Sequence, residues 1–184
     1  FHADDWQDFD GLHAGADGEF IYETIDRELG RVDPKPVIEL IAPENRSPFR
    51  TRRRAYWSLL AGAGGHSLTE RPTRTLADGW EKAAADSIGA RELGYLAKLL
   101  KIRPLNNSKP APKVVFGTRR GARYVSALKG NGYAILYIPT GENAEVDLVE
   151  LSFTKWNAWW FDPRKGEAKK ADPVFTADTY MRFN

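Results

Sequence analysis

The sequence predicts a two-domain protein in which an α/β part with parallel strands precedes an all-β part with antiparallel strands. Before residue 103, strand-like apolar runs alternate with helix-like segments, as in consecutive βα units. Residues 103–113, RPLNNSKPAPK, hold three prolines and two asparagines, which is typical of a linker. After them, short segments with a period of two favour a small antiparallel β-sandwich. We therefore expect domains at residues 1–103 and 104–184.

The first half is expected to contain three strands, each followed by a helix. The run PKPVIELIA is apolar without alternation, which is typical of a strand covered on both faces. The leucines of the last segment recur at helical spacing and define one apolar stripe. The expected strands are residues 6–14, 34–42 and 63–68, and the expected helices are residues 18–29, 47–62 and 81–101.

The second half is expected to be a series of short strands joined by tight turns. The tripeptide GNG at residues 130–132 is a strong hairpin signal, because glycine accepts positive φ angles without strain. The expected strands are residues 113–118, 123–130, 132–139, 144–151 and 155–163.

Composition and charge exclude several classes of protein. The net charge of +2 is too small to indicate a nucleic-acid partner, and the run RTRRR is interpreted as a solvated or ion-paired helix face. The absence of cysteine excludes disulfides and a thiolate nucleophile. No apolar stretch approaches the roughly 20 residues of a membrane span.

Two motifs of the second half resemble a known domain. The turn YIPTG, with Tyr137, Pro139 and Gly141, and the stretch WWFDPRKG at residues 159–166 resemble the domain named "putative collagen-binding domain". That domain typically follows the catalytic barrel of apiosidase-like glycoside hydrolases. The segments PKPVIELIAPE, RRRAYWSLLAGAGGHSL and IGARELGYLAKLL are similar to the last strand, helix, strand and helix of that barrel.

The resemblance implies a partial (β/α)8 TIM-type barrel followed by an antiparallel β-sandwich. A closed barrel needs about 250 residues, so the chain is expected to be a fragment. It implies a glycoside hydrolase acting on polysaccharide side chains, with a polysaccharide or oligosaccharide substrate, no cofactor, and a secreted or periplasmic location. The acid/base belongs to an earlier strand, so the fragment is expected to be inactive alone. The alternative is a non-catalytic carbohydrate- or protein-binding or structural β-sandwich module.

Two glutamates are candidates for the catalytic nucleophile that the resemblance implies. Glycoside hydrolysis requires two carboxyl groups, and the nucleophile is expected at the end of PVIELIAPEN. Ile41 occupies the usual position of the first glutamate, which leaves Glu39 within the strand and Glu44 just beyond it. Glu44 is preferred because its position corresponds to the barrel mouth. The alternatives are an exposed loop carboxylate for Glu44 and an internal ion pair with an arginine for Glu39.

Four further residues are candidates for substrate contacts. His13 and His66 would stand at the ends of the strands beside Glu39, where an imidazole can hydrogen-bond sugar hydroxyls. Asp10 could face the barrel mouth, and Trp80 could stack on a sugar ring. The alternatives are ordinary loop residues for the histidines, a helix cap or solvated carboxylate for Asp10, and a loop anchor for Trp80.

No metal site is expected. The aspartates of HADDWQDFD lack the regular spacing and the glycine of a calcium loop. In the last expected strand, Trp159 and Trp160 would point to opposite faces, since side chains alternate along a strand. One tryptophan therefore leaves the core, and it either stacks on a glycan or covers the contact with the barrel.

Overall fold

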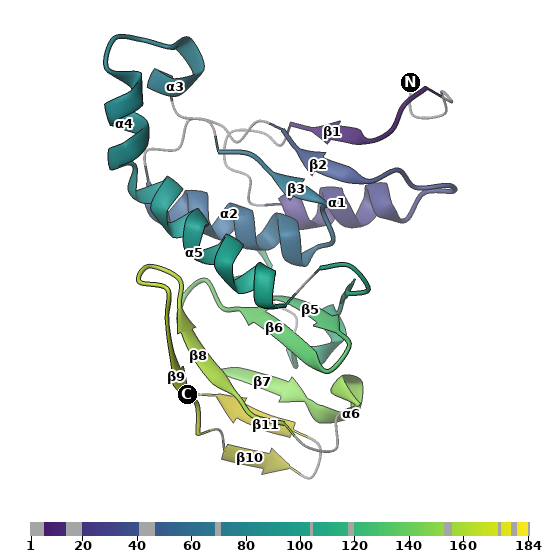
Figure 1. The fold of residues 1–184 in the computed structure, drawn as a ribbon. Helices are drawn as coiled ribbons and strands as arrows, with labels where there is room; N and C mark the ends of the chain where they lie inside the picture. The colour runs from purple at the N-terminus through teal and green to yellow at the C-terminus, as the bar shows by residue number, and fades with distance from the viewer. Residues whose placement is uncertain are drawn as a thin grey trace. The chain divides into compact units, whose positions relative to one another are not determined.

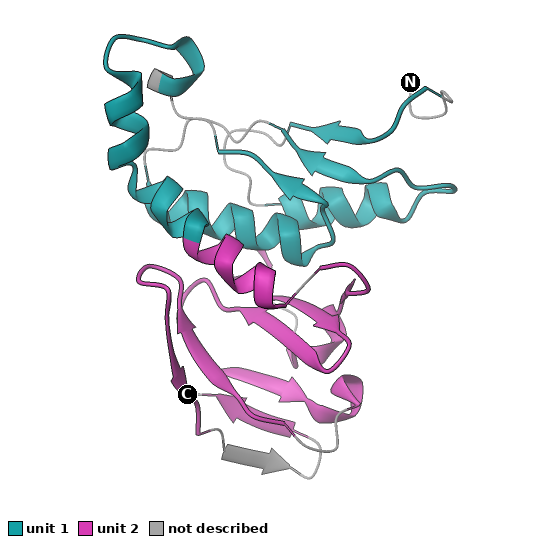
Figure 2. Ribbon diagram, viewed as in Figure 1, with its two compact units in different colours: residues 1–94 teal, residues 95–184 magenta. Residues whose placement is uncertain are grey.

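The computed structural model shows a chain that divides into two compact units, residues 1–94 and 95–184 (Figure 2). The division falls within helix α5 (Ile88–Ile102), whereas the linker composition predicts a domain boundary after residue 103. The structure describes residues 6–13, 20–40, 47–68, 71–103, 105–117, 120–152, 156–172, 174–177 and 180–183.

The first unit is built on a small parallel sheet (Figure 1). Its strands β1 (Asp10–Leu12), β2 (Val37–Glu39) and β3 (Gly65–His66) lie in the order β1-β2-β3. Leu12 is paired with Glu39, and Glu39 is paired with His66. The predicted parallel pairing of the three strands is therefore confirmed, and their carboxyl ends meet at one edge of the sheet.

Helices α1 (Ile21–Leu29) and α2 (Pro48–Leu60) lie along one face of this sheet (Figure 1). Proline suits the first turn of α2, where the backbone N–H that it lacks has no helical acceptor. Between the helices, the ring of the fully buried Trp57 meets Tyr22 edge to face at 5.5 Å. On β2, Val37 and Glu39 are buried, whereas Ile38 between them is half-buried, so the two faces of the strand differ.

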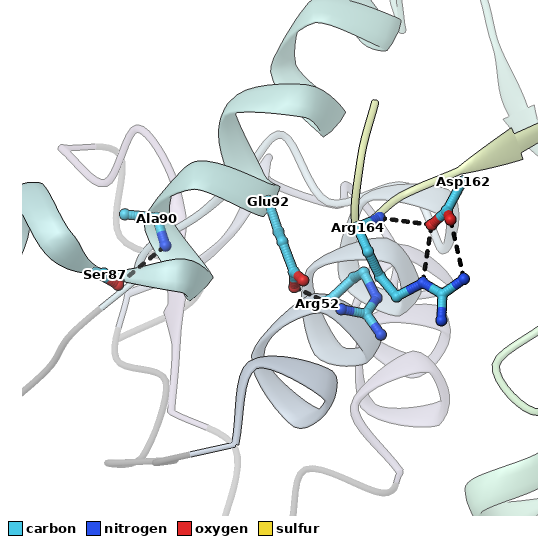
Figure 3. Close-up of polar contacts among 6 residues, drawn as sticks. All are labelled: Arg52, Ser87, Ala90, Glu92, Asp162 and Arg164. Atoms are coloured by element: carbon cyan, nitrogen blue, oxygen red, sulfur yellow. Dashed lines mark hydrogen bonds and ion pairs between the residues drawn. The ribbon is translucent and has the colours of Figure 1, made fainter. Parts of the chain in front are cut away.

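The single helix predicted at residues 81–101 is wrong, because two helices occupy this stretch. Helix α4 (Trp80–Asp86) ends where Ser87 takes an extended conformation, and α5 begins at the next residue. The Ser87 hydroxyl accepts a hydrogen bond from the Ala90 backbone N–H at 3.1 Å (Figure 3). Serine thereby satisfies an amide that has no helical acceptor and starts a new helix. A short helix, α3 (Arg71–Thr75), precedes α4 and was not predicted.

The second unit contains antiparallel strands, as predicted, and every strand pair that the structure describes there is antiparallel. Asn131 and Gly132 join β5 to β6, with Gly132 at a φ of 76°, so the hairpin predicted from GNG is confirmed. The strands are β4 (Lys109–Pro110), β5 (Ser126–Gly130), β6 (Tyr133–Tyr137), β7 (Ala144–Asp147), β8 (Trp159–Asp162), β9 (Glu167–Lys170), β10 (Val174–Ala177) and β11 (Tyr180–Phe183). They form the sheets β4-β5-β6 and β10-β11-β7 and the hairpin β8-β9.

Two of the strands predicted in the second unit differ in the structure, because a short helix occupies part of each stretch. Residues 113–118 contain the end of a 3-10 helix, η1 (Pro112–Val114), and a single bridge from Val115 to Val146, because proline favours a helical first turn. The strand predicted at residues 144–151 stops at Asp147. Its carboxylate accepts the backbone N–H of Val149 at 2.8 Å and starts α6 (Leu148–Leu151). A second 3-10 helix, η2 (Gly121–Arg123), precedes β5.

A small apolar core lies among these elements, with Val114, Ala127, Val146 and Leu151 buried together. The turn between β8 and β9 requires glycine at position 166. Gly166 has a φ of 72°, and a Cβ atom there would lie 2.6 Å from Cδ1 of Tyr95. Within the described part of the chain, no helix combines the length and the apolar character needed to cross a membrane.

Candidate functional site

A buried polar cluster surrounds Glu39 at the carboxyl end of β2. The Glu39 carboxylate accepts hydrogen bonds from Nε of Arg54 and from Oγ of Ser58. Nδ1 of His66, on β3, lies 2.6 Å from Oε2 of Glu39. These four residues are called the Glu39 cluster below. Arg54 and Ser58 stand four residues apart on α2, so they lie on the same face of that helix and approach Glu39 together.

The contacts of the cluster determine where its protons lie. An ionised carboxylate only accepts hydrogen bonds, so the short contact assigns a proton to Nδ1 of His66. The other ring nitrogen, Nε2, is buried and has no hydrogen-bond partner among the described residues. The His66 side chain is 3% exposed, which makes it part of the interior.

Burial raises the pKa of the Glu39 carboxyl, because the charged form loses its hydration. The hydrogen bond and charge of His66, the charge of Arg54 and the hydrogen bond of Ser58 lower the pKa by more. The pKa of Glu39 therefore lies below its ordinary value of 4.5, and the group is ionised at neutral pH. A carboxylate in this state cannot act as a general acid.

This lowered pKa predicts a dependence of stability on pH. Glu39 has a lower pKa in the folded than in the unfolded chain, so its contribution to stability is fully present above about pH 4.5 and is lost as the pH falls through the folded pKa. We expect the free energy of unfolding, measured by urea titration, to fall more steeply below pH 4.5 in the native chain than in Glu39→Gln. Parallel pH profiles of the two proteins would contradict the assignment.

The geometry favours one of the two interpretations of Glu39. Its side chain has no exposed surface, and its oxygens are engaged by an arginine, a serine and a histidine. A glycosidase nucleophile must reach the anomeric carbon of a sugar. The contacts match the alternative stated for Glu39, an internal ion pair with an arginine, and its partners on α2 show that it faces the helices.

The other predicted site residues are distributed over the first unit. His13 is exposed and directly follows β1, so it lies at the same edge of the sheet as Glu39 and His66. Asp10 is the first residue of β1, is paired with Val37, and accepts a hydrogen bond from Nε2 of Gln7 at 2.5 Å.

Trp80 is half-buried at the start of α4. Glu44 and Ile41 lie outside the described residues, as do the first two aspartates of the acidic amino-terminal stretch. The structure therefore brings His13, Glu39 and His66 to one edge of the sheet. Asp10 stands at the opposite end of the same strands.

The sequence analysis offered an arginine as a partner of Glu39 without identifying which one, and it missed Ser58. Besides Arg54, the run RTRRR contains Arg52, whose Nη1 lies 2.5 Å from Oε2 of Glu92 (Figure 3). The guanidinium of Arg53 lies over the Trp57 ring at 4.6 Å. Of the two interpretations of the run, ion pairing is the one that describes Arg52 and Arg54. The available signal was the high arginine content of a helix that follows a strand with an internal glutamate.

In the hairpin of β8 and β9, the two paired tryptophans point to opposite faces, as predicted. The Trp160 ring meets Phe183 of β11 edge to face at 6.0 Å, whereas Trp159 is 62% exposed. In the turn, Asp162 accepts hydrogen bonds from the backbone N–H, Nε and Nη2 of Arg164, each at 2.9 Å (Figure 3). The Arg164 side chain is the largest influence, and together with the backbone bond and the charge of Lys165 it lowers the pKa of Asp162 to about 2.

This pKa can be measured directly. In a carbon-detected NMR titration, the Asp162 carboxyl is expected to titrate near pH 2, and Arg164→Gln is expected to move its pKa toward 3.8. The reason is that glutamine removes two hydrogen bonds and a charge but leaves the backbone donor. Arg103→Gln, elsewhere in the same unit, is the control and should leave the titration unchanged. Titration near pH 3.8 in the native chain would show that the pair does not form.

Comparisons with known proteins match parts or all of this chain. Residues 110–184 match the family described as "Putative collagen-binding domain of a collagenase". A solved structure named "Glycoside hydrolase" is 22% identical with a TM-score of 0.82, covering 99% of this chain and 46% of that chain. A glycoside hydrolase family 5 protein from Bacteroides vulgatus ATCC 8482 is 22% identical with a TM-score of 0.84, covering 100% of this chain and 52% of that chain. No curated protein matches the chain.

The two solved structures establish the fold of this chain. The chain spans about half the length of the two solved structures. At 22% identity, the likeness shows the fold alone. The chain as a whole therefore has the fold of part of a glycoside hydrolase chain, and its last 75 residues carry the match to the collagen-binding family.

Proposed function

We propose that this chain is the carboxyl-terminal part of a glycoside hydrolase. Residues 1–103 would supply the closing strands of a (β/α)8 barrel, and residues 104–184 would form an appended β-sandwich. The observation that supports this most is the likeness to two glycoside hydrolase structures. Each likeness covers 99% or 100% of this chain and therefore includes both of its units. The parallel order β1-β2-β3, with α1 and α2 on one face, is the arrangement that consecutive βα units of such a barrel require.

The proposed substrate is a polysaccharide or oligosaccharide side chain of the kind cleaved by apiosidase-like enzymes, and the proposed location is secreted or periplasmic. Both follow from the resemblance of WWFDPRKG and PVIELIAPEN to that family. Hydrolysis needs a carboxylic acid on one side of the glycosidic bond and a carboxylate on the other. We assign the acid to a strand that precedes Phe1 in a longer protein.

We propose the roles from the order of the residues along the chain, since substrates of barrel enzymes bind where the strands end. We assign the nucleophile to Glu44, which follows β2 by five residues. We assign sugar contacts to His13 and Trp80. Glu39 and His66 are assigned a supporting role, since their contacts hold the ends of β2 and β3 to helix α2.

The experiment that tests this proposal compares two proteins on the same substrates. The longer protein, with the strands that precede Phe1, is expected to release sugar from branched pectic and arabinose-type oligosaccharides. The 184-residue chain is expected to release none, because it lacks the acid. Hydrolysis by the short chain, or none by the longer protein on any oligosaccharide of a broad panel, would contradict the proposal.

A second candidate is a non-catalytic binding module. The observation that favours it is the family match of residues 110–184, which contain the exposed Trp159. In this case, the chain would bind a glycan or a fibrous protein without cleaving it. A longer protein that binds oligosaccharides but leaves them intact would support this function over the first.

A further inference from the structure

We infer that the exposed face of the β8-β9 hairpin is a binding surface for an acidic polysaccharide, in which Trp159 stacks on a sugar ring and Lys170 pairs with its carboxylate. This inference concerns the second unit alone and does not rest on the hydrolase proposal. It is built from the register of one hairpin, the exposure of one aromatic ring and the charges beside it.

The register brings the two side chains together. Trp159 of β8 is paired directly with Lys170 of β9, and Phe161 is paired with Ala168 (Figure 1 shows the two strands). Directly paired residues of antiparallel strands point to the same face, with Cβ atoms about 5 Å apart. These four residues, called the Trp159 surface below, therefore share one face. Trp160 points to the opposite face, where it contacts Phe183.

The Trp159 surface is open to a ligand. Trp159 is 62% exposed, and all four residues of β9 are exposed. Within the described residues, neither the Trp159 ring nor the Lys170 ammonium contacts another side chain by ring contact, hydrogen bond or ion pair. A large aromatic ring that is exposed to solvent on a paired strand can stack on a ligand without first being uncovered.

The charge of the hairpin favours an anion. Residues 159–170 contain four basic and two acidic side chains. Arg164 and Asp162 neutralise each other through their ion pair at 2.9 Å, so the free charge comes mainly from the lysines. Lys170 lies on the same face as Trp159, so a ligand on that ring meets a positive charge at its edge.

A sugar fits this surface better than a folded protein does. A stable protein interface buries about 800 Å² per partner around several apolar anchors. The Trp159 surface offers one strongly exposed ring, beside the half-buried Phe161, the small Ala168 and the charged Lys170, which is too few anchors for such an interface. A pyranose ring needs only one flat aromatic partner, and a carboxylate on that sugar uses the neighbouring ammonium. Among carbohydrates, the geometry therefore points to uronic acid chains.

Calorimetric titration of the 184-residue chain tests the inference. The probes are an oligogalacturonide of defined length and a neutral galactose oligosaccharide of equal length. We expect tighter binding of the acidic probe, weakening as salt rises. Trp159→Ala is expected to weaken binding by about tenfold or more, the usual effect of removing a central aromatic anchor. Trp159→Phe should restore part of the affinity.

Lys170→Gln separates the contribution of charge from that of stacking. It is expected to weaken binding of the acidic probe by about threefold, as for an exposed ion pair, and to flatten the salt dependence. The matched controls are Lys109→Gln, which removes a charge from another exposed strand, and Phe116→Ala, which removes an exposed ring elsewhere in the unit. Both should bind like the native chain.

Three outcomes would overturn the inference. They are no binding of the oligogalacturonide, equal binding by the native chain and Trp159→Ala, and binding of a triple-helical collagen peptide that Trp159→Ala abolishes while the sugar fails to bind. Because no hydrolysis is measured, failure here leaves the hydrolase proposal untouched, and inactivity of the longer protein leaves this surface untouched. Circular dichroism of each variant is the control that the chain remains folded.

Discussion

Replacing Glu44 by glutamine in the longer protein is expected to lower kcat/KM by about a thousandfold, which corresponds to about 4 kcal/mol of transition-state stabilisation. The physical reason is that glutamine keeps the size of the side chain but cannot form or stabilise the glycosyl intermediate. The measurement is release of sugar from the best substrate of the panel, expressed per folded protein.

The matched variant is Glu39→Gln, which makes the same chemical change five residues earlier. Because Glu39 is enclosed by Arg54, Ser58 and His66, its loss is expected to lower kcat/KM less than about tenfold where the protein remains folded. A thousandfold loss in Glu39→Gln with native-like circular dichroism, and none in Glu44→Gln, would reverse the assignment of the two glutamates.

Glu39→Gln is expected to have its main effect on stability, with a loss of about 3 kcal/mol or more in the free energy of unfolding. The Arg54 side chain is 5% exposed, and without the carboxylate its buried charge loses the ion pair with Glu39. In Glu39→Gln, the amide nitrogen of glutamine is also a hydrogen-bond donor, and it would face the donors of Arg54, Ser58 and His66. The measurement is urea denaturation of the 184-residue chain near neutral pH, followed by circular dichroism.

The control for this stability measurement is an exposed ion pair. Nη2 of Arg123 lies 2.6 Å from Oε2 of Glu142, and their side chains are 63% and 39% exposed. Glu142→Gln is therefore expected to change the free energy of unfolding by less than about 1 kcal/mol, because water screens the pair. Equal losses in Glu39→Gln and Glu142→Gln would show that burial does not govern the contribution of Glu39.

Much of the fold was predictable from local patterns. Apolar runs such as residues 34–42 predicted β2, and the alternation with helices predicted its parallel partners β1 and β3. The hairpin at Gly132 was predictable because only glycine adopts its backbone conformation without strain. Capping residues within good helix or strand sequences were missed. Ser87 divides a helix, and Asp147 ends a strand, each through one side-chain hydrogen bond to the backbone.

The Glu39 cluster shows why a candidate site is harder to predict than a strand. Position within a strand indicates that Glu39 is internal, but not which partners it has. Those partners lie 15, 19 and 27 residues further along the chain. The packing of α2 against the sheet brings Arg54 and Ser58 to Glu39, and the pairing of β2 with β3 brings His66. Local periodicity does not predict which residues these tertiary contacts join. The opposite directions of Trp159 and Trp160 were predictable, since they follow from strand geometry alone.

The most direct test of the account is the strand pairing of β1 in a crystal structure of the longer protein. In the described part of the chain, β1 and β3 are the outer strands of their sheet. If this sheet closes a (β/α)8 barrel, the outer edges of β1 and β3 will each pair with a further parallel strand from the preceding residues. An outer edge of β1 that is antiparallel to its neighbour, or that is left in solvent, would contradict the account.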